Sequence, residues 1–139
     1  ELVQITQPEQ SMKCLQDLLA NACEILDKLE LPYQIIELCT GDLGFSSAKT
    51  FDIEVWMPSQ NKYREISSCS NFTALQARRA NIKYKSKNEN RFVHTINGSG
   101  LAVGRCLIAL IENYFDGNDL IKVPNCLQEY FGSDSIKVN

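Results

Sequence analysis

The chain has 139 residues, of which 44% are hydrophobic and 22% are charged, and its formal net charge is −3. These values are typical of one soluble globular domain that is large enough to bury a core. A weakly acidic balance does not indicate nucleic-acid binding, although a local basic patch remains compatible with it.

No targeting, membrane or metal-binding segment is recognisable. The start, Glu1–Gln4, has neither the charge nor the apolarity of a signal peptide. The longest apolar run, Cys106–Ile111, is too short to span a bilayer. The six cysteines include no Cys-x-x-Cys pair, and several stand in apolar periodic segments. We therefore predict no disulfide framework, zinc site or membrane contact, and we expect a reducing, cytoplasmic location.

The first half of the chain predicts a helix followed by strands. Pro8 and Glu9 suit the first turn of a helix, and apolar residues recur at helical spacing as far as Leu29. Pro32 prevents the helix from continuing. The remaining segments are a strand end or linker at 1–7, a strand at 33–39, a turn at 40–44, one helical turn at 45–49, and an antiparallel hairpin of strands 50–57 and 63–70.

The second half predicts a short helix capped by Thr73, two strands and two more helices. The helix from Leu101 is apolar nearly all round, so we expect it to be buried. The expected segments are a helix at 71–81, strands at 82–86 and 92–96, turns at 97–100 and 117–119, a helix opened by 123–124 with apolar residues at 127, 130 and 131, and a frayed end at 133–139. This order predicts a single α+β unit, residues 1–139, with a mostly antiparallel sheet flanked by helices.

Arg105 is the only charged side chain in the first ten residues of that apolar helix. A buried guanidinium is costly unless it meets an anion, and no carboxylate follows before Glu112. Gly98, Gly100 and Gly104 leave room for another group to approach the backbone. The pattern therefore indicates either a polyphosphate site or a core arginine paired with a carboxylate distant in sequence.

Two polar features also allow two interpretations. The open face of the 50–70 hairpin carries many carboxylates and hydroxyls, which suit either a binding site or a solvated sheet face. Between Arg78 and Arg91 there are six basic residues and one acidic residue, Glu89. They could neutralise RNA phosphates, but lysines on an edge strand also block unwanted sheet pairing, which the pattern favours.

Three long stretches, residues 40–56, 63–79 and 93–105, resemble in order and spacing the C-terminal half of the catalytic domain of bacterial-type seryl-tRNA synthetase. The similarity runs from Pro8 to Gly132. It implies a class II synthetase fold, an antiparallel sheet with flanking helices. It also implies an enzyme that activates serine with ATP to seryl-adenylate and transfers the seryl group to tRNA(Ser).

The resemblance also implies roles for particular residues. Arg105 matches the arginine of the third class II motif, which meets the ATP γ-phosphate, and Ser99 matches a position that binds the serine substrate. The stretch that contacts ATP would be Glu65, Ile66, Ser67 and Ser68. Glu65 and Ser68 would help to hold Mg²⁺, and in a regular strand they would point to opposite faces, so their joint use requires a bulge or twist. His94 and Cys69 are interpreted as structural.

Several parts of the family pattern have no counterpart in this sequence. These are the N-terminal helical arm, the first two class II motifs and the carboxylate that binds serine. The resemblance therefore implies the C-terminal part of a longer catalytic domain, which in the intact family is a homodimer. We expect residues 1–139 alone to be inactive. The alternative is a non-catalytic, synthetase-like module for nucleotide binding or protein interaction.

Overall fold

The computed structural model describes residues 1–87 and 89–138. In this part of the chain, five strands form one antiparallel sheet, which confirms the predicted α+β class. In spatial order the strands are β1 (Leu2–Thr6), β7 (His94–Gly98), β4 (Lys62–Asn71), β3 (Lys49–Met57) and β2 (Tyr33–Glu37). The predicted hairpin is β3 and β4, joined by the short 3-10 helix η2 (Pro58–Gln60).

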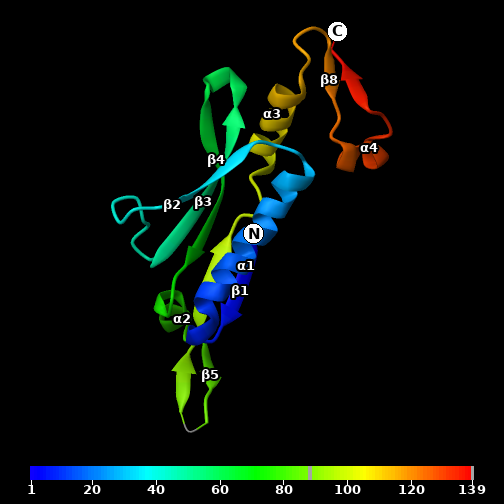
Figure 1. Ribbon diagram of the computed structural model, residues 1–139. Helices are drawn as coiled ribbons and strands as arrows, with labels where there is room; N and C mark the ends of the chain where they lie inside the picture. The colour runs from blue at the N-terminus through cyan, green and yellow to red at the C-terminus, as the bar shows by residue number, and fades with distance from the viewer. Residues whose placement is uncertain (88, 139) are drawn as a thin grey trace.

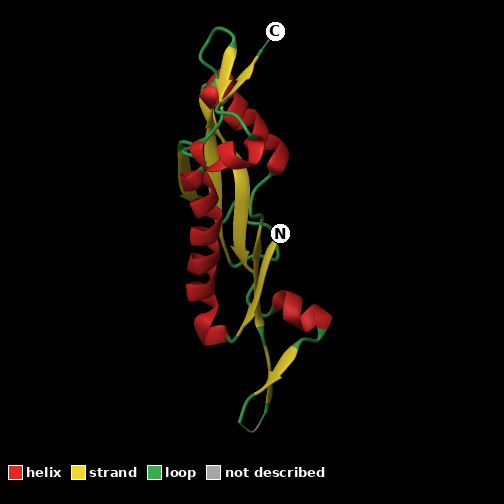
Figure 2. Ribbon diagram, turned by 90° about the vertical axis from the view of Figure 1, so that its right-hand side faces the viewer, coloured by secondary structure: helices red, strands yellow, loops and turns green. Residues whose placement is uncertain are grey.

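One face of this sheet carries the core. Helix α1 (Ser11–Lys28), preceded by the 3-10 turn η1 (Pro8–Gln10), runs along the sheet (Figures 1 and 2). Its buried stripe packs over β7 and β4, and burial of such side chains is the main source of stability. The core residues from the helix and from β3, β4 and β7 are Leu15, Leu18, Leu19, Ala22, Cys23, Leu26, Ile53, Val55, Met57, Ile66, Cys69 and Ile96.

Helix α3 (Val103–Tyr114) joins the same core through Cys106 and Ala109. The prediction that this helix is buried nearly all round is wrong for this structure, because Val103 is 75% exposed and Leu107 is 57% exposed. Arg105 is exposed as well, so the expected burial of its guanidinium is also wrong. The helix meets the sheet along one narrow face, and an apolar sequence does not specify how many neighbours a helix has.

Two small units lie at opposite ends of the molecule (Figure 1). At one end, helix α2 (Leu75–Ala80) leads into a hairpin of β5 (Lys83–Lys85) and β6 (Asn90–Phe92). The other end holds β8, α4 and β9, which span Leu120–Lys122, Asn125–Phe131 and Ser135–Lys137. Within the described residues, no helix is both long enough and apolar enough to cross a bilayer. All six cysteines are free thiols.

Several predicted boundaries were wrong. The strand expected at 92–96 is divided at Val93 between β6 and β7, and Gly98, assigned to a turn, is the last residue of β7. The expected helical turn at 45–49 is a non-helical turn at 45–46 followed by a bend at 48, and Lys49 already belongs to β3. Thr73 does not cap α2: it has a positive φ of 49°, and its N–H donates to Asn71 Oδ1 at 2.8 Å.

The C-terminal segment also differs from its prediction. The end expected to be frayed contains β9, which pairs with β8, while Asn139 lies outside the described residues. Helix α4 is present, but Tyr130 is 87% exposed and Phe131 is 55% exposed. Only Leu127 among its expected apolar contacts packs against the core. The pairing between β8 and β9 is non-local, so local apolar spacing did not reveal it.

Candidate functional site

A bulge in β4 determines which side chains share the open face of the sheet. Ile53 pairs with Ser67 and Glu54 pairs with Glu65, so Ile66 is an extra residue in β4. Beyond the bulge, Asp52 pairs with Ser68. Directly paired residues lie on the same face, as do Asp52 and Glu54 two positions apart in β3. Glu65 and Ser68 therefore share the face opposite the core, as their joint use requires.

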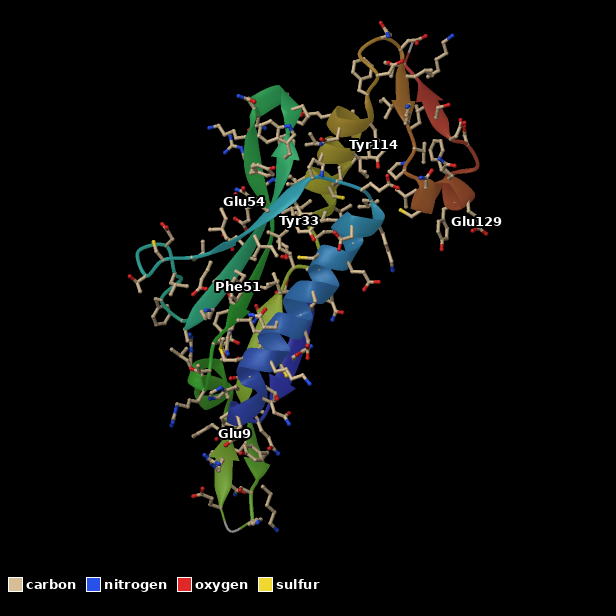
Figure 3. All side chains as sticks on the ribbon, viewed as in Figure 1. Glu9, Tyr33, Phe51, Glu54, Tyr114 and Glu129 are labelled. Carbon is tan, nitrogen blue, oxygen red and sulfur yellow. The ribbon has the colours of Figure 1, made fainter. Side chains whose placement is uncertain are left out.

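Carboxylates dominate this face around the bulge. Glu54 lies across from Glu65, and Gln34 of β2 donates to Glu54 Oε2 at 2.7 Å. Figure 3 labels Glu54 and Phe51, which mark the middle of β3. Asp52 Oδ1 is buried and has no hydrogen-bond partner within residues 1–87 and 89–138. A buried carboxylate oxygen without a partner is costly, and a cation on this face would supply the missing partner.

The segment 99–105 is fastened to three successive residues of this bulge. The carbonyl of Glu65 accepts a hydrogen bond from Arg105 Nη1. The carbonyl of Ile66 accepts one from the N–H of Ala102 at 2.9 Å, and Ser67 Oγ donates to the carbonyl of Ser99. These bonds bring two parts of the sequence, about 35 residues apart, into one site.

An open groove of about 890 Å³ lies between the β3–β4 hairpin and the start of α3. Glu54, Tyr63 and Glu65 line the hairpin side of the groove, and Val103 and Arg105 line the helix side. The groove thus joins an exposed guanidinium to an acidic sheet face. An arginine fork beside carboxylates is suited to holding a polyphosphate together with its divalent cation.

The structure gives the sequence-predicted residues different surroundings. Glu65 and Arg105 line the groove, and Ser68 is half-buried on the same face as Glu65. Ile66 and Ser67 are each only 2% exposed, so their side chains are not available to a ligand in the groove. Ser99 is half-buried beside Ser67. Asp52 was not singled out from the sequence, although strand alternation placed it on this face.

Two reactive residues lie away from the groove. His94 Nδ1 is 3.0 Å from Ser11 Oγ, whose hydroxyl donates to the carbonyl of Pro8. Burial lowers the pKa of His94, while the nearby Glu9 charge opposes this change. Cys69 is fully buried, and burial raises the pKa of its thiol. A raised pKa disfavours the nucleophilic thiolate, so the geometry gives both residues structural surroundings.

The fold and this site define a class II synthetase core. Residues 1–114 match the family model described as the tRNA synthetase class II core domain (G, H, P, S and T). The chain therefore belongs to the class II tRNA synthetase core-domain family, which confirms the resemblance deduced from the three sequence stretches.

The names of the relatives are more specific than the description of the family. The serine–tRNA ligases of Hydrogenobaculum sp. and Finegoldia magna are each 58% identical over 137 residues, which cover 98% of this chain and 32% of theirs. A seryl-tRNA synthetase of Pyrococcus horikoshii, solved with ATP, superposes with a TM-score of 0.95 at 38% identity, covering 99% of this chain and 31% of that one. The cytoplasmic serine–tRNA ligase of Naegleria fowleri, solved with AMP, gives 0.91 at 34%, with coverages of 99% and 33%. The chain spans about a third of the length of the curated relatives it matches.

Proposed function

We propose that this chain is the C-terminal part of the catalytic domain of a serine–tRNA ligase. The complete enzyme would activate serine with ATP and transfer the seryl group to tRNA(Ser), as a cytoplasmic homodimer. The observation that carries this proposal is the attachment of residues 99–105 to the bulge of β4, which gathers Glu65, Ser68, Ser99 and Arg105. The names of the relatives, and the nucleotides in two of their structures, support the same activity.

In this proposal Arg105 binds the γ-phosphate of ATP. One of its nitrogens donates to the carbonyl of Glu65, which fixes the guanidinium at the edge of the groove. A guanidinium has five N–H donors in a planar fork, so others remain for phosphate oxygens. Ile66 and Ser67 would contact ATP only through their backbones, because their side chains are buried.

Glu65 and Ser68 would hold Mg²⁺, with Asp52 beside them. The residues fit the ion, because they offer hard oxygen donors on one face, and the buried Asp52 Oδ1 lacks a hydrogen-bond partner in the described structure. No group of three His, Cys, Asp or Glu ligands is present within the described residues. Mg²⁺ is usually held by one or two protein groups together with substrate phosphates, and when bound it neutralises phosphate charge.

The proposed reaction needs positioning more than a protein nucleophile. A carboxylate oxygen of serine attacks the α-phosphorus of ATP, the bond to the bridging oxygen of the β-phosphate breaks, and pyrophosphate leaves. A terminal ribose hydroxyl of tRNA then attacks the seryl carbonyl, and AMP leaves. Ser99 would place serine, while Arg105 would hold the phosphate that departs. Alignment and charge neutralisation of this kind supply most of the catalysis in phosphoryl-transfer sites.

The test is serine-dependent exchange of pyrophosphate into ATP by the complete enzyme. Arg105→Ala should lower the exchange rate on the order of 100-fold, as expected for removal of a preorganised charge contact. Arg79→Ala, which removes an exposed arginine of α2, is the matched control and should leave exchange unchanged. Equal rates for Arg105→Ala and the parent enzyme would contradict the assigned role.

The same assay on residues 1–139 alone examines the expectation that this segment is inactive. Exchange only in the complete enzyme would support an incomplete half-site. Nucleotide binding by the complete protein without any exchange would favour the non-catalytic module instead.

A further inference from the structure

The hairpin β5–β6 and the end of α2 form a basic hairpin, defined here as residues 78–92. Six basic side chains and one acidic side chain lie between Arg78 and Arg91, although the whole chain carries a net charge of −3. Positive charge is therefore concentrated on one element of an otherwise acidic molecule. Figure 1 shows that this element projects beyond the end of the main sheet, where a large partner can reach it.

The strand register separates the basic side chains into two faces. Tyr84 pairs with Arg91 on one face, and Arg91 forms ion pairs with Glu9 at 3.3 Å and with Glu89 at 3.5 Å. Figure 3 labels Glu9 next to the base of the hairpin. Arg91 thus has its charge compensated and fastens the hairpin to the body of the protein.

The opposite face of the basic hairpin holds cations without such compensation. Lys83 pairs with Phe92, and Lys85 follows on the same face. Arg78 Cζ lies 4.7 Å from the centre of the Phe92 ring, and Lys83 Nζ lies 4.8 Å from it. Within residues 1–87 and 89–138, no ion pair joins Arg78, Lys83 or Lys85 to a carboxylate.

The aromatic ring explains how like charges are held close together. Cation–π attraction to Phe92 offsets part of the repulsion between Arg78 and Lys83. It also fixes both side chains, which lowers the entropy lost when they meet an anion. Protection of an edge strand explains Lys83 and Lys85, but it does not explain Arg78, which comes from helix α2 and meets the same ring.

We propose that Arg78, Lys83 and Lys85 bind the phosphate backbone of the RNA substrate. This inference rests on the proposed function, which supplies tRNA as the partner. Basic side chains that meet phosphates supply affinity and position the RNA without reading its sequence. The basic hairpin would therefore act on tRNA and leave the activation of serine unaffected.

The experiment compares the complete enzyme with its Lys83→Glu/Lys85→Glu variant. Glutamate keeps charged residues on the edge strand, so protection against strand pairing is retained while the sign of the charge is reversed. Binding is measured by fluorescence anisotropy with a tRNA(Ser) transcript and with a transcript for another amino acid, from about 50 to 200 mM salt. Lys83→Gln/Lys85→Gln is a milder variant, and Lys137→Glu is the control, because strand β9, to which Lys137 belongs, is part of the unit at the opposite end of the molecule.

Loss of two phosphate contacts should make the plot of log affinity against log salt shallower by about 1.5 to 2, for both transcripts. Affinity should fall by roughly tenfold or more at low salt. Lys137→Glu should change neither value, and serine-dependent exchange without tRNA should be the same in all variants.

An unchanged salt slope in both double variants would overturn the proposal. Loss of binding to phosphatidylserine vesicles, with the tRNA slope unchanged, would overturn it in favour of a membrane surface. A reduced slope in an enzyme that shows no serine-dependent exchange would support RNA binding by the basic hairpin and contradict the proposed function. Failure of RNA binding by the hairpin and failure of the proposed function would therefore give different results.

Discussion

At the residue scale, Gly98 determines how closely β7 approaches β4. A Cβ atom at this position would lie 2.8 Å from Cys69 Sγ and 2.9 Å from both Cys69 Cα and the carbonyl oxygen of Ser68. Two of these neighbours are backbone atoms, so the strands themselves would have to separate. Because Ser68 belongs to the candidate magnesium site and Ser99 follows Gly98, such a movement would disturb both.

Gly98→Ala should destabilise the protein by about 1–3 kcal/mol, the usual cost of overpacking a close contact. Gly104→Ala is the control, because within the described residues no atom outside its chain neighbours and its own helix backbone lies within 4 Å of a Cβ there, and alanine is favoured in a helix; it should be neutral or stabilising by up to about 1 kcal/mol. Urea unfolding of the complete enzyme would measure the change in the free energy of unfolding for both variants. Similar stabilities for the two variants would show that the strands adapt at no cost.

Asp52 provides a second prediction at this scale. We expect the buried Oδ1 to help attract Mg²⁺ to Glu65 and Ser68. Asp52→Asn removes this negative charge but keeps a side chain of nearly the same shape. The concentration of Mg²⁺ needed for half-maximal pyrophosphate exchange should then rise several-fold, while the maximal rate at saturating Mg²⁺ changes less. Binding of Mn²⁺ with ATP, followed by proton relaxation, gives a readout independent of turnover. An unchanged Mg²⁺ requirement would leave Asp52 without a role in the metal site.

At the scale of elements, the bulge of β4 and the segment 99–105 act as one unit. Ser67 is 2% exposed and its hydroxyl donates to the carbonyl of Ser99, so it positions that residue without facing the groove. Ser67→Ala should raise KM for serine several-fold, with a smaller effect on KM for ATP, because Arg105 and Glu65 remain connected. Ser67→Thr keeps the hydroxyl and should recover part of the loss. Equal increases in both KM values would indicate general disruption of the site.

The sequence predicted those elements whose signal is local. Alternation defined β3, the turn residues after it defined β4 as the returning strand, and proline with helical spacing defined α1, so these three agree with the structure. Non-local features were missed. The pairing of β9 with β8 and the division at Val93 depend on partners elsewhere in the chain. The exposure of Val103 depends on how much surface the sheet offers to α3.

Only part of the site could be predicted. Glu65 and Ser68 are three positions apart and had to share a face, which required a bulge, and the strand register has that bulge at Ile66. The hydrogen bonds from Arg105, Ala102 and Ser67 were not predictable, because each ends on a backbone carbonyl, and a backbone acceptor leaves no mark on the residue type. Arg105 drew attention as a buried charge, yet it is exposed and rests on a carbonyl.

At the scale of the whole molecule, the two faces of the sheet differ: one face packs into the core, and the other carries the candidate ligand-binding groups. The core face is covered by α1 and part of α3, and the open face collects carboxylates and hydroxyls. His94 belongs to the core side, where it links strand β7 to the start of α1 through Ser11. The protonation state of the single histidine in this chain is therefore coupled to contacts between the sheet and its main helix.

This coupling predicts a specific pH dependence of stability. Burial lowers the pKa of His94 below its ordinary value of 6.5, so the folded chain binds fewer protons here than the unfolded chain. The contribution of His94 is fully present above pH 6.5 and is lost as the pH falls through the lower, folded-state pKa.

His94→Asn keeps a donor near the position of Nδ1 for Ser11 but does not titrate. The stability of the parent enzyme should therefore fall more steeply between pH 7.5 and 5.5 than that of the variant, measured by urea unfolding. Other groups contribute equally to both proteins, so the difference isolates His94. Parallel pH profiles would show that His94 has the same pKa in the folded and unfolded states.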